Sequence, residues 1–197
     1  FNMFYNEGSS AAQANRLIVR NRISLANPLP RSYQPQIARV PGVKEVAITQ
    51  WFGGTYKDAR DPNNFFARFA VEAEKLPIVY PEYKLTPEEL KAFLSERTAC
   101  IVGNKLAQRH GFKLGDRVTL VGDIFPVTLE LVVRGIYQAD RDNENMWFHY
   151  EYLNESLGEV RRDSVGTFTI LMESPDDATR IAQTVDATFR NSPQQTK

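Results

Sequence analysis

The run DRVTLVGDIFPVTLELVVRGIY, residues 116–137, restricts the possible fold more than any other part of the chain. Its two halves alternate apolar and polar residues with period two, the pattern of strands with one buried and one solvent-facing side. The run therefore predicts a β-hairpin. Before it, ACIVG (99–103) predicts a buried strand, and NKLAQRHG (104–111) predicts a short helix that ends at Gly111. These segments together predict a compact α+β unit.

The beginning of the chain predicts a strand, a helix and a second strand. Residues 15–24 (NRLIVRNRIS) alternate arginines with the apolar residues Leu17, Val19 and Ile23. A short helix is expected within residues 28–42, because Tyr33, Ile37 and Val40 recur at helical spacing before a Pro-Gly pair. Residues 43–51 predict the second strand, with Trp51 on or near its core-facing side.

The end of the chain predicts a strand followed by a helix. Residues 165–172 (VGTFTILM) predict the strand. In the helix that follows, Ser174 is the expected cap and Pro175 the first helical position, and two acidic residues suit the first turn. The two ends of the chain therefore carry matching elements. They predict one split α/β subdomain, residues 1–64 plus 158–197, with a second small α/β subdomain, residues 65–157, inserted into it.

The inserted part contains three further elements. FFARFAV (65–71) predicts an aromatic strand. Thr86, Pro87 and Glu89 form a strong start signal for a helix. MWFHYEYLNESLG (146–158) is compatible with either a strand or a helix, and the sequence leaves that choice open.

The composition excludes several classes of partner. The 197 residues include 24 lysines and arginines against 24 aspartates and glutamates, so no net charge favours nucleic acid. The single cysteine, Cys100, lies in an apolar run and excludes an intramolecular disulfide. No apolar run reaches the ~18 residues that a membrane-spanning helix needs. The start FNMFYNEGSS lacks a methionine, and we interpret the chain as part of a longer protein.

The histidines provide a poor basis for catalysis. His110 falls in the last turn of the predicted helix, where exposed carbonyl groups favour a polar or positive ring. A catalytic role would need a nucleophile or a second ligand nearby, and the other histidine, His149, is far away in sequence. We therefore expect no catalytic set and no cofactor.

An acidic loop supports a second hypothesis. Asp140, Asp142 and Glu144 alternate in DRDNEN, and alternate carboxylates can direct oxygen ligands at one cation. The glycine and the distant glutamate of an EF-hand are missing, so a solvated loop is the preferred interpretation and we expect no metal. The alternative is a small metal-dependent hydrolase that uses the loop 140–144 together with His149.

Aromatic residues beside polar loops indicate a surface for a partner. The residues are Trp51, Phe52, Phe65, Phe66, Trp147 and Phe148. Core packing is the competing interpretation. If the aromatic residues are exposed, the domain could serve as a passive adaptor for peptide or lipid.

The order of these motifs resembles the MacB-like periplasmic core domain of FtsX-like ABC transporter permeases. The matching stretches are SYQPQIARVPGVKEVAITQWFGG, then CIVGNKLAQRHGFKLGDRVTLVGDIFPVTLELVVRGIY, then the last strand and helix. The resemblance covers nearly the whole chain. The segment FFARFAVEAEKLPIVYPEYKL departs from the shorter segment of the best-known members, which leaves substrate and partner contacts open.

The resemblance implies a porter-like subdomain built from both chain ends. It also implies a non-enzymatic, extracytoplasmic (periplasmic) domain that stands outside the inner membrane between transmembrane helices of its own full-length chain. A cytoplasmic ABC ATPase would act on it indirectly, and the full-length protein would pair as a dimer. The expected role is to transmit conformational change or to engage a periplasmic protein, peptide or lipid substrate.

Overall fold

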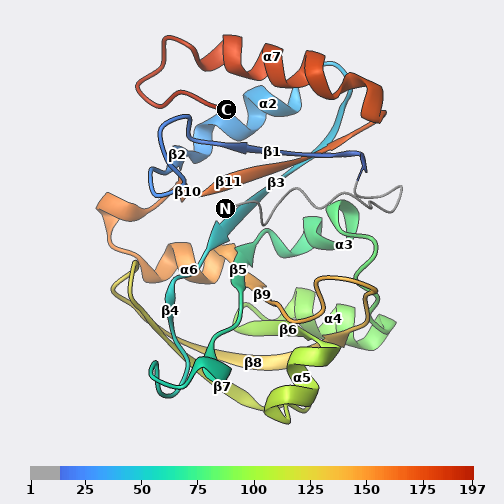
Figure 1. Cartoon of the computed structure of the whole chain (residues 1–197), viewed down its shortest axis with the longest axis vertical. Coiled ribbons are helices and arrows are strands. Elements are labelled where there is room, and N and C mark those ends of the chain that lie inside the picture. The colour runs from blue at the N-terminus through green and yellow to red at the C-terminus, as the bar shows by residue number, and fades with distance from the viewer. Residues whose placement is uncertain (1–13) are drawn as a thin grey trace.

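A nine-stranded mixed sheet extends through the molecule (Figure 1). The computed structural model describes residues 14–197, so the start of the chain that we interpreted above lies outside the described residues. The strand order is β1 (Arg16–Arg20), β11 (Thr167–Met172), β3 (Val43–Trp51), β5 (Arg68–Val71), β9 (Met146–His149), β6 (Ala99–Gly103), β8 (Thr128–Tyr137), β7 (Arg117–Gly122) and β4 (Gly54–Thr55). The predicted α+β class is confirmed.

Strands from the two chain ends are neighbours in the sheet. β11 pairs antiparallel with β1 on one side and with β3 on the other. Helices α2 (Gln34–Ala38) and α7 (Ala178–Phe189) lie together at this end of the molecule (Figure 1). Tyr33, just before α2, stacks on Phe189 with ring centroids 3.9 Å apart. The predicted order of elements at both ends is confirmed.

The residues between the two ends form the other side of the sheet. β5 runs parallel to β9, and β6 runs parallel to β8. All five residues of β6 are buried, and β7 and β8 form the predicted hairpin. The helices of this part are α3 (Leu76–Val79), α4 (Pro87–Ser95), α5 (Asn104–His110) and α6 (Tyr150–Ser156). A separate two-stranded sheet pairs β2 (Leu29–Pro30) with β10 (Ser164–Val165).

Two helix boundaries follow the predicted signals. The Thr86 hydroxyl accepts a hydrogen bond from the Glu89 N–H at 3.2 Å, and the Glu89 carboxylate accepts one from the Thr86 N–H at 2.9 Å. This reciprocal pair is the capping box of α4. After α5, Gly111 adopts φ +69°, a left-handed conformation that glycine tolerates because it has no Cβ.

Two predicted strands are shorter in the structure. β1 ends at Arg20, whose backbone N–H and carbonyl then pair with Lys197, and Ile23 lies beyond the strand with 81% of its surface exposed. β5 begins at Arg68 rather than at residue 65, because a 3-10 turn capped by Asp61 occupies the preceding residues. The ambiguous run 146–158 contains both β9 and α6.

Strand β3 belongs to both parts of the molecule. Its residues 43–49 pair with β11, and its last three residues, 49–51, pair with β5. The division into residues 1–64 plus 158–197 and 65–157 stays a prediction, and the sheet passes through β3 from one part to the other. Across residues 14–197, no helix is both long enough and apolar enough to span a membrane.

Candidate interaction site

Four of the six aromatic residues predicted to contact a partner are buried. Phe52 and Phe148 are 0% exposed, and they pack edge to face with ring centroids 5.8 Å apart. Phe66 and Trp147 are 2% and 3% exposed. The prediction is therefore corrected for these four residues, whose large apolar rings are used in the core. Only Trp51 and Phe65 remain available to a partner.

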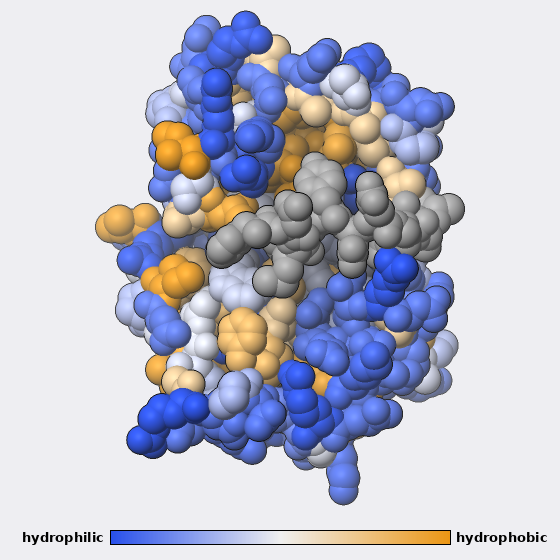
Figure 2. Space-filling model, viewed as in Figure 1, coloured by the Kyte–Doolittle hydropathy of each residue, from blue (hydrophilic) through white to orange (hydrophobic). Residues whose placement is uncertain are grey.

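The exposed aromatic residues form part of an apolar surface. Trp51 is 36% exposed and Phe65 is 63% exposed, and their ring centroids are 6.5 Å apart. Ile124, 55% exposed, covers Gly53 so closely that a Cβ there would lie 2.6 Å from the Ile124 Cδ1. We call Trp51, Phe65 and Ile124 the Trp51 surface. The orange groups between blue ones in Figure 2 show that apolar patches on the drawn face alternate with polar residues.

Arg68 fixes the backbone beneath the Trp51 surface. Its buried side chain donates from Nε to the Phe66 carbonyl at 3.1 Å and from Nη1 to the Gly54 carbonyl. Burial lowers the pKa of the Arg68 guanidinium, and the charge of Asp123 opposes that shift. The two carbonyl contacts join β4 to β5, so the backbone that carries both exposed rings is held in one arrangement.

Arg16 joins β1 to the region of α3. Its guanidinium donates to both carboxylate oxygens of Glu82 at 2.9 Å and 2.6 Å, and to the Val79 carbonyl at 2.8 Å. The guanidinium carbon also lies 4.6 Å from the centroid of the Tyr80 ring. Only 10% of the Arg16 side chain and 21% of the Glu82 side chain are exposed, so this bidentate pair is largely shielded from water. We call Arg16, Val79 and Glu82 the Arg16 junction.

Glu72 makes a second connection between the two parts. It follows β5, and its carboxylate accepts hydrogen bonds from the Ile48 N–H in β3 at 2.9 Å and from the Gln34 side chain in α2 at 2.6 Å. Lys75 lies 3.4 Å from the same carboxylate. One carboxylate therefore joins a strand, a helix and the start of the α3 region.

His110 occupies an aromatic environment rather than a polar one. Its ring lies 5.5 Å from those of Tyr56 and Phe66 and 5.3 Å from that of Phe112, between centroids. Its Nε2 atom is buried and has no hydrogen-bond partner among residues 14–197. Burial, with a smaller contribution from nearby cations, lowers the pKa of His110. The expectation of a polar or positive ring at the helix end is therefore corrected, because these surroundings favour the neutral form.

His149 and Cys100 also lack the surroundings of reactive groups. His149 lies on β9, and its Nε2 contacts the Phe93 carbonyl at 2.7 Å. Burial lowers the pKa of His149. Burial likewise raises the pKa of the Cys100 thiol, which is 0% exposed, so the nucleophilic thiolate is disfavoured.

The acidic loop and His149 do not come together. Asp140, Asp142 and Glu144 are exposed. The Tyr137 hydroxyl and the Asn143 side chain bind backbone carbonyls of this loop, and Glu144 lies 3.5 Å from Arg109. No three His, Cys, Asp or Glu side chains among the described residues are placed to hold a metal ion. The hydrolase alternative therefore gains no support from the geometry.

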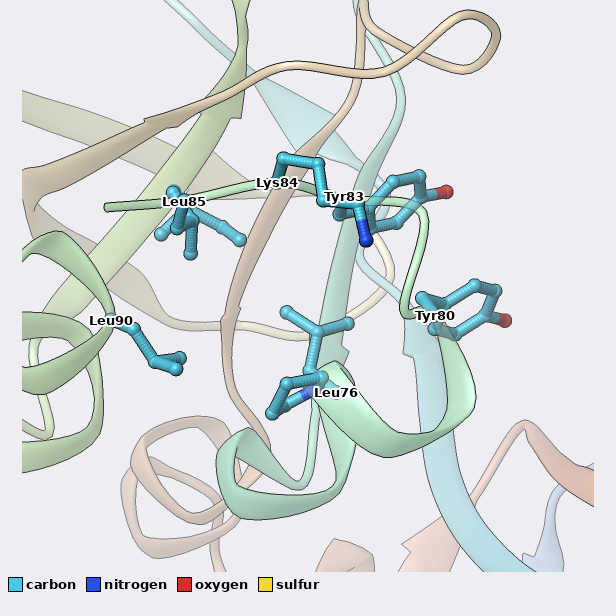
Figure 3. A pocket seen from close by; sticks show the side chains of 8 residues that line it. Leu76, Tyr80, Tyr83, Lys84, Leu85 and Leu90 are labelled. Carbon is cyan, nitrogen blue, oxygen red and sulfur yellow. The ribbon is translucent and has the colours of Figure 1, made fainter. Parts of the chain in front are cut away.

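A small apolar hollow lies between α3, residues 80–85 and α4 (Figure 3). Its volume is about 130 Å³, and its lining includes Leu76, Tyr83, Leu85 and Leu90. Pockets for drug-sized ligands are typically about 300–1,000 Å³. The hollow has room for one apolar side chain or a few water molecules, and it gives no reason to expect a larger cofactor.

Comparison with known proteins identifies the family. The model of the MacB-like periplasmic core domain matches residues 2–188 of the chain. The chain belongs to this family. A search of curated proteins found no significant match.

Solved structures share the fold of this MacB-like domain. One is the extracellular domain of the noncanonic ABC-type transporter YknZ from Gram-positive bacteria, with a TM-score of 0.63 and 15% identity over 93% of this chain and 98% of that one. Another is the periplasmic region of MacB from Actinobacillus actinomycetemcomitans, with a TM-score of 0.63 and 10% identity over 93% and 87% of the two chains. At these identities the likeness concerns the fold. The resemblance inferred from the motifs is confirmed.

Sequence reasoning missed the polar residues that connect the two parts of this MacB-like domain. Arg16 lies in an alternating strand, where an arginine is normally expected to face water. Glu72 and Glu82 lie in a segment with many charges. Only their contacts distinguish them. Arg68 carried one usable signal, because it is a single cation within the apolar run FFARFAV.

Proposed function

We propose that the chain is the extracytoplasmic domain of an ABC-type permease and that it transmits conformational change as one connected body. Family membership supports the placement in a membrane-anchored transporter, on the periplasmic side. In this proposal, transmembrane helices of the full-length chain move the domain when a cytoplasmic ATPase hydrolyses ATP, and the full-length protein acts as a dimer. The chain itself performs no catalysis.

The observation that carries the proposal is the set of connections between the two parts. β3 is hydrogen bonded to both, and the Arg16 junction and Glu72 add largely shielded polar contacts on one side of it. Movement of the part formed by the chain ends would then carry the inserted part with it. Such coupling requires an element whose arrangement is biased by the nucleotide state, and here that element would be the membrane helices.

The test uses the full-length permease with its ATPase in lipid nanodiscs. Spin labels at Gln183→Cys on α7 and Leu114→Cys after α5 report the distance across the domain, and a labelled lipid reports movement of Leu114 relative to the bilayer. We expect the internal distance to stay constant between nucleotide states while the distance to the bilayer changes. An internal distance that changes with ATP, or no movement relative to the bilayer, would contradict the proposal.

Variants at the junction sharpen this test. Arg16→Ala should broaden the internal distance distribution and reduce the ATP-dependent movement of the Leu114 label, because the bidentate contact to Glu82 is lost. Arg97→Ala removes a contact to Glu155 whose partners are 54% and 57% exposed, so it is a matched control that should leave both distances unchanged.

We propose in addition that the Trp51 surface contacts a periplasmic protein or peptide. Exposed aromatic rings beside an exposed isoleucine suit the apolar centre of an interface. A photo-crosslinking amino acid at Phe65 should give a discrete crosslinked product in cells, and one at Leu114, which is similarly exposed, should not. Equal products at both positions, or none at Phe65, would remove this assignment.

A further inference from the structure

The loop after β1 presents two apolar side chains to solvent. Ile23 is 81% exposed and Leu25 is 48% exposed. The loop is held by specific hydrogen bonds at its base: the Ile23 N–H donates to the Asn21 side chain at 2.9 Å, and the Arg22 N–H donates to the Gln195 carbonyl at 2.8 Å. Asn21 is only 1% exposed and also donates to the Gln194 side chain at 2.8 Å. The exposure of Ile23 is therefore built into the fold.

A cationic hollow lies beside this loop. Its volume is about 460 Å³, and its lining residues are Arg22, Asp186, Arg190, Gln195, Thr196 and Lys197. Asp186 is the single carboxylate side chain in the lining, and it accepts a hydrogen bond from the Thr196 hydroxyl at 3.0 Å. None of the three cationic side chains forms an ion pair with an Asp or Glu among residues 14–197.

The local charge excess is notable because the whole chain has zero net charge. Guanidinium groups bind phosphate oxygens in paired hydrogen bonds, and ammonium groups bind them as point charges. An exposed isoleucine next to such groups can enter the boundary between lipid headgroups and acyl chains. Together, apolar tip and cationic hollow are complementary to a surface that presents phosphates above hydrocarbon.

We infer that residues 21–25 and the adjacent cationic hollow bind the surface of an anionic phospholipid bilayer. This inference rests on the proposed function, which places the domain beside the membrane. The loop lies at the end of the molecule that carries α7, opposite the turn between α5 and β7 (Figure 1). Contact at this end would orient the domain on the bilayer while the inserted part points away from it.

The experiment uses the folded 197-residue chain and vesicles of phosphatidylglycerol mixed with phosphatidylethanolamine. An environment-sensitive fluorophore is attached at Ile23→Cys, and in a matched control at Leu114→Cys, which is 55% exposed at the other end of the molecule. Cys100 is 0% exposed and should not react. We expect a blue shift at position 23 alone, no shift with phosphatidylcholine vesicles, and weakening in about 0.5 M salt because screening shortens the range of charge attraction.

Charge reversal tests the hollow. Arg22→Glu with Arg190→Glu should weaken vesicle binding about tenfold or more, since each cation near an anionic surface adds to the attraction. Arg60→Glu with Arg97→Glu changes the net charge equally at other exposed positions and should have little effect. Melting temperatures establish that both double variants are folded.

Three outcomes would overturn the inference. They are no blue shift on anionic vesicles, an equal shift at Leu114, and binding of inorganic phosphate to the wild-type chain without any response to vesicles. Neither ATPase nor transport enters this experiment, so its failure leaves the test of conformational transmission unaffected.

Discussion

At the scale of residues, the most informative side chain is Arg68. A buried guanidinium with backbone carbonyls as partners is costly to desolvate, and it persists because those carbonyls would otherwise lack donors. Arg68 thus stabilises the fold by satisfying Gly54 and Phe66 rather than by forming an ion pair. Its position beneath the Trp51 surface ties the shape of that surface to a single side chain.

Replacement of Arg68 by methionine should therefore destabilise the domain. Methionine keeps much of the apolar stem but leaves two buried carbonyls without their donor, and the expected loss is about 2–3 kcal/mol of unfolding free energy. Urea unfolding followed by tryptophan fluorescence measures it, because the environment of Trp51 should change as well. Arg60→Met, at a side chain that is 90% exposed, is the control. A stability equal to wild type would mean that water replaces the lost donor.

His110 predicts a dependence on pH. Its pKa in the folded state is lowered, so the unfolded chain, with a histidine pKa of about 6.5, takes up protons first as the pH falls. Stability that is complete well above that value should be lost progressively below it. His149 contributes in the same direction.

The variant His110→Phe isolates the contribution of His110. Phenylalanine suits the rings of Tyr56 and Phe112 and removes the buried Nε2, so the variant should be no less stable at pH 7.5 and should lose less melting temperature between pH 7 and pH 5. Thermal unfolding at several pH values measures both. A steeper loss in acid than wild type would contradict the neutral, buried histidine.

At the scale of elements, local signals decided the helices better than the strands. The start of α4 was predictable because Thr86, Pro87 and Glu89 act on their own backbone neighbours. The division of residues 146–158 into β9 and α6 was not, because β9 exists through pairing with β5 and β6, far away in sequence. The four buried aromatic residues were misjudged for the same reason: neighbours in space cover them.

The capping box of α4 gives a prediction at this scale. Thr86→Ala removes the oxygen that accepts from the Glu89 N–H and should cost about 1 kcal/mol of unfolding free energy. Thr86→Ser keeps that oxygen and should stay close to wild type. Chemical denaturation of both variants makes the comparison. Equal losses in the two variants would assign the effect to the methyl group instead of the hydrogen bond.

At the scale of the whole molecule, the two chain ends were predictable and the mixed sheet was not. Matching strand and helix patterns indicated that the ends belong together, and β1, β11 and β3 are indeed neighbours. Parallel pairing of β5 with β9 and of β6 with β8 carries no local signature, since it depends on long-range closure. The exposed Trp51 surface likewise became visible only once its covering neighbours were known.

Charge balance predicts colloidal behaviour. The net charge is zero at pH 7, so repulsion between copies should be weakest there. Light scattering of dilute solutions at low salt should give the most attractive second virial coefficient near pH 7, with weaker attraction about two pH units to either side. The variant Arg60→Glu with Arg97→Glu should move this minimum to lower pH. Attraction that ignores pH would implicate the apolar surfaces instead.

The sharing of β3 between two partners has a mechanical consequence. A load applied lengthwise along this strand is opposed by all the rungs of its ladders at once, as in shear, whereas a sideways load at its Trp51 end meets only the three rungs to β5 and can open them in succession. The domain should then be stiff to a push or pull directed along β3 and compliant to a lateral one. A force that enters through the chain ends would be delivered to the far side with direction preserved.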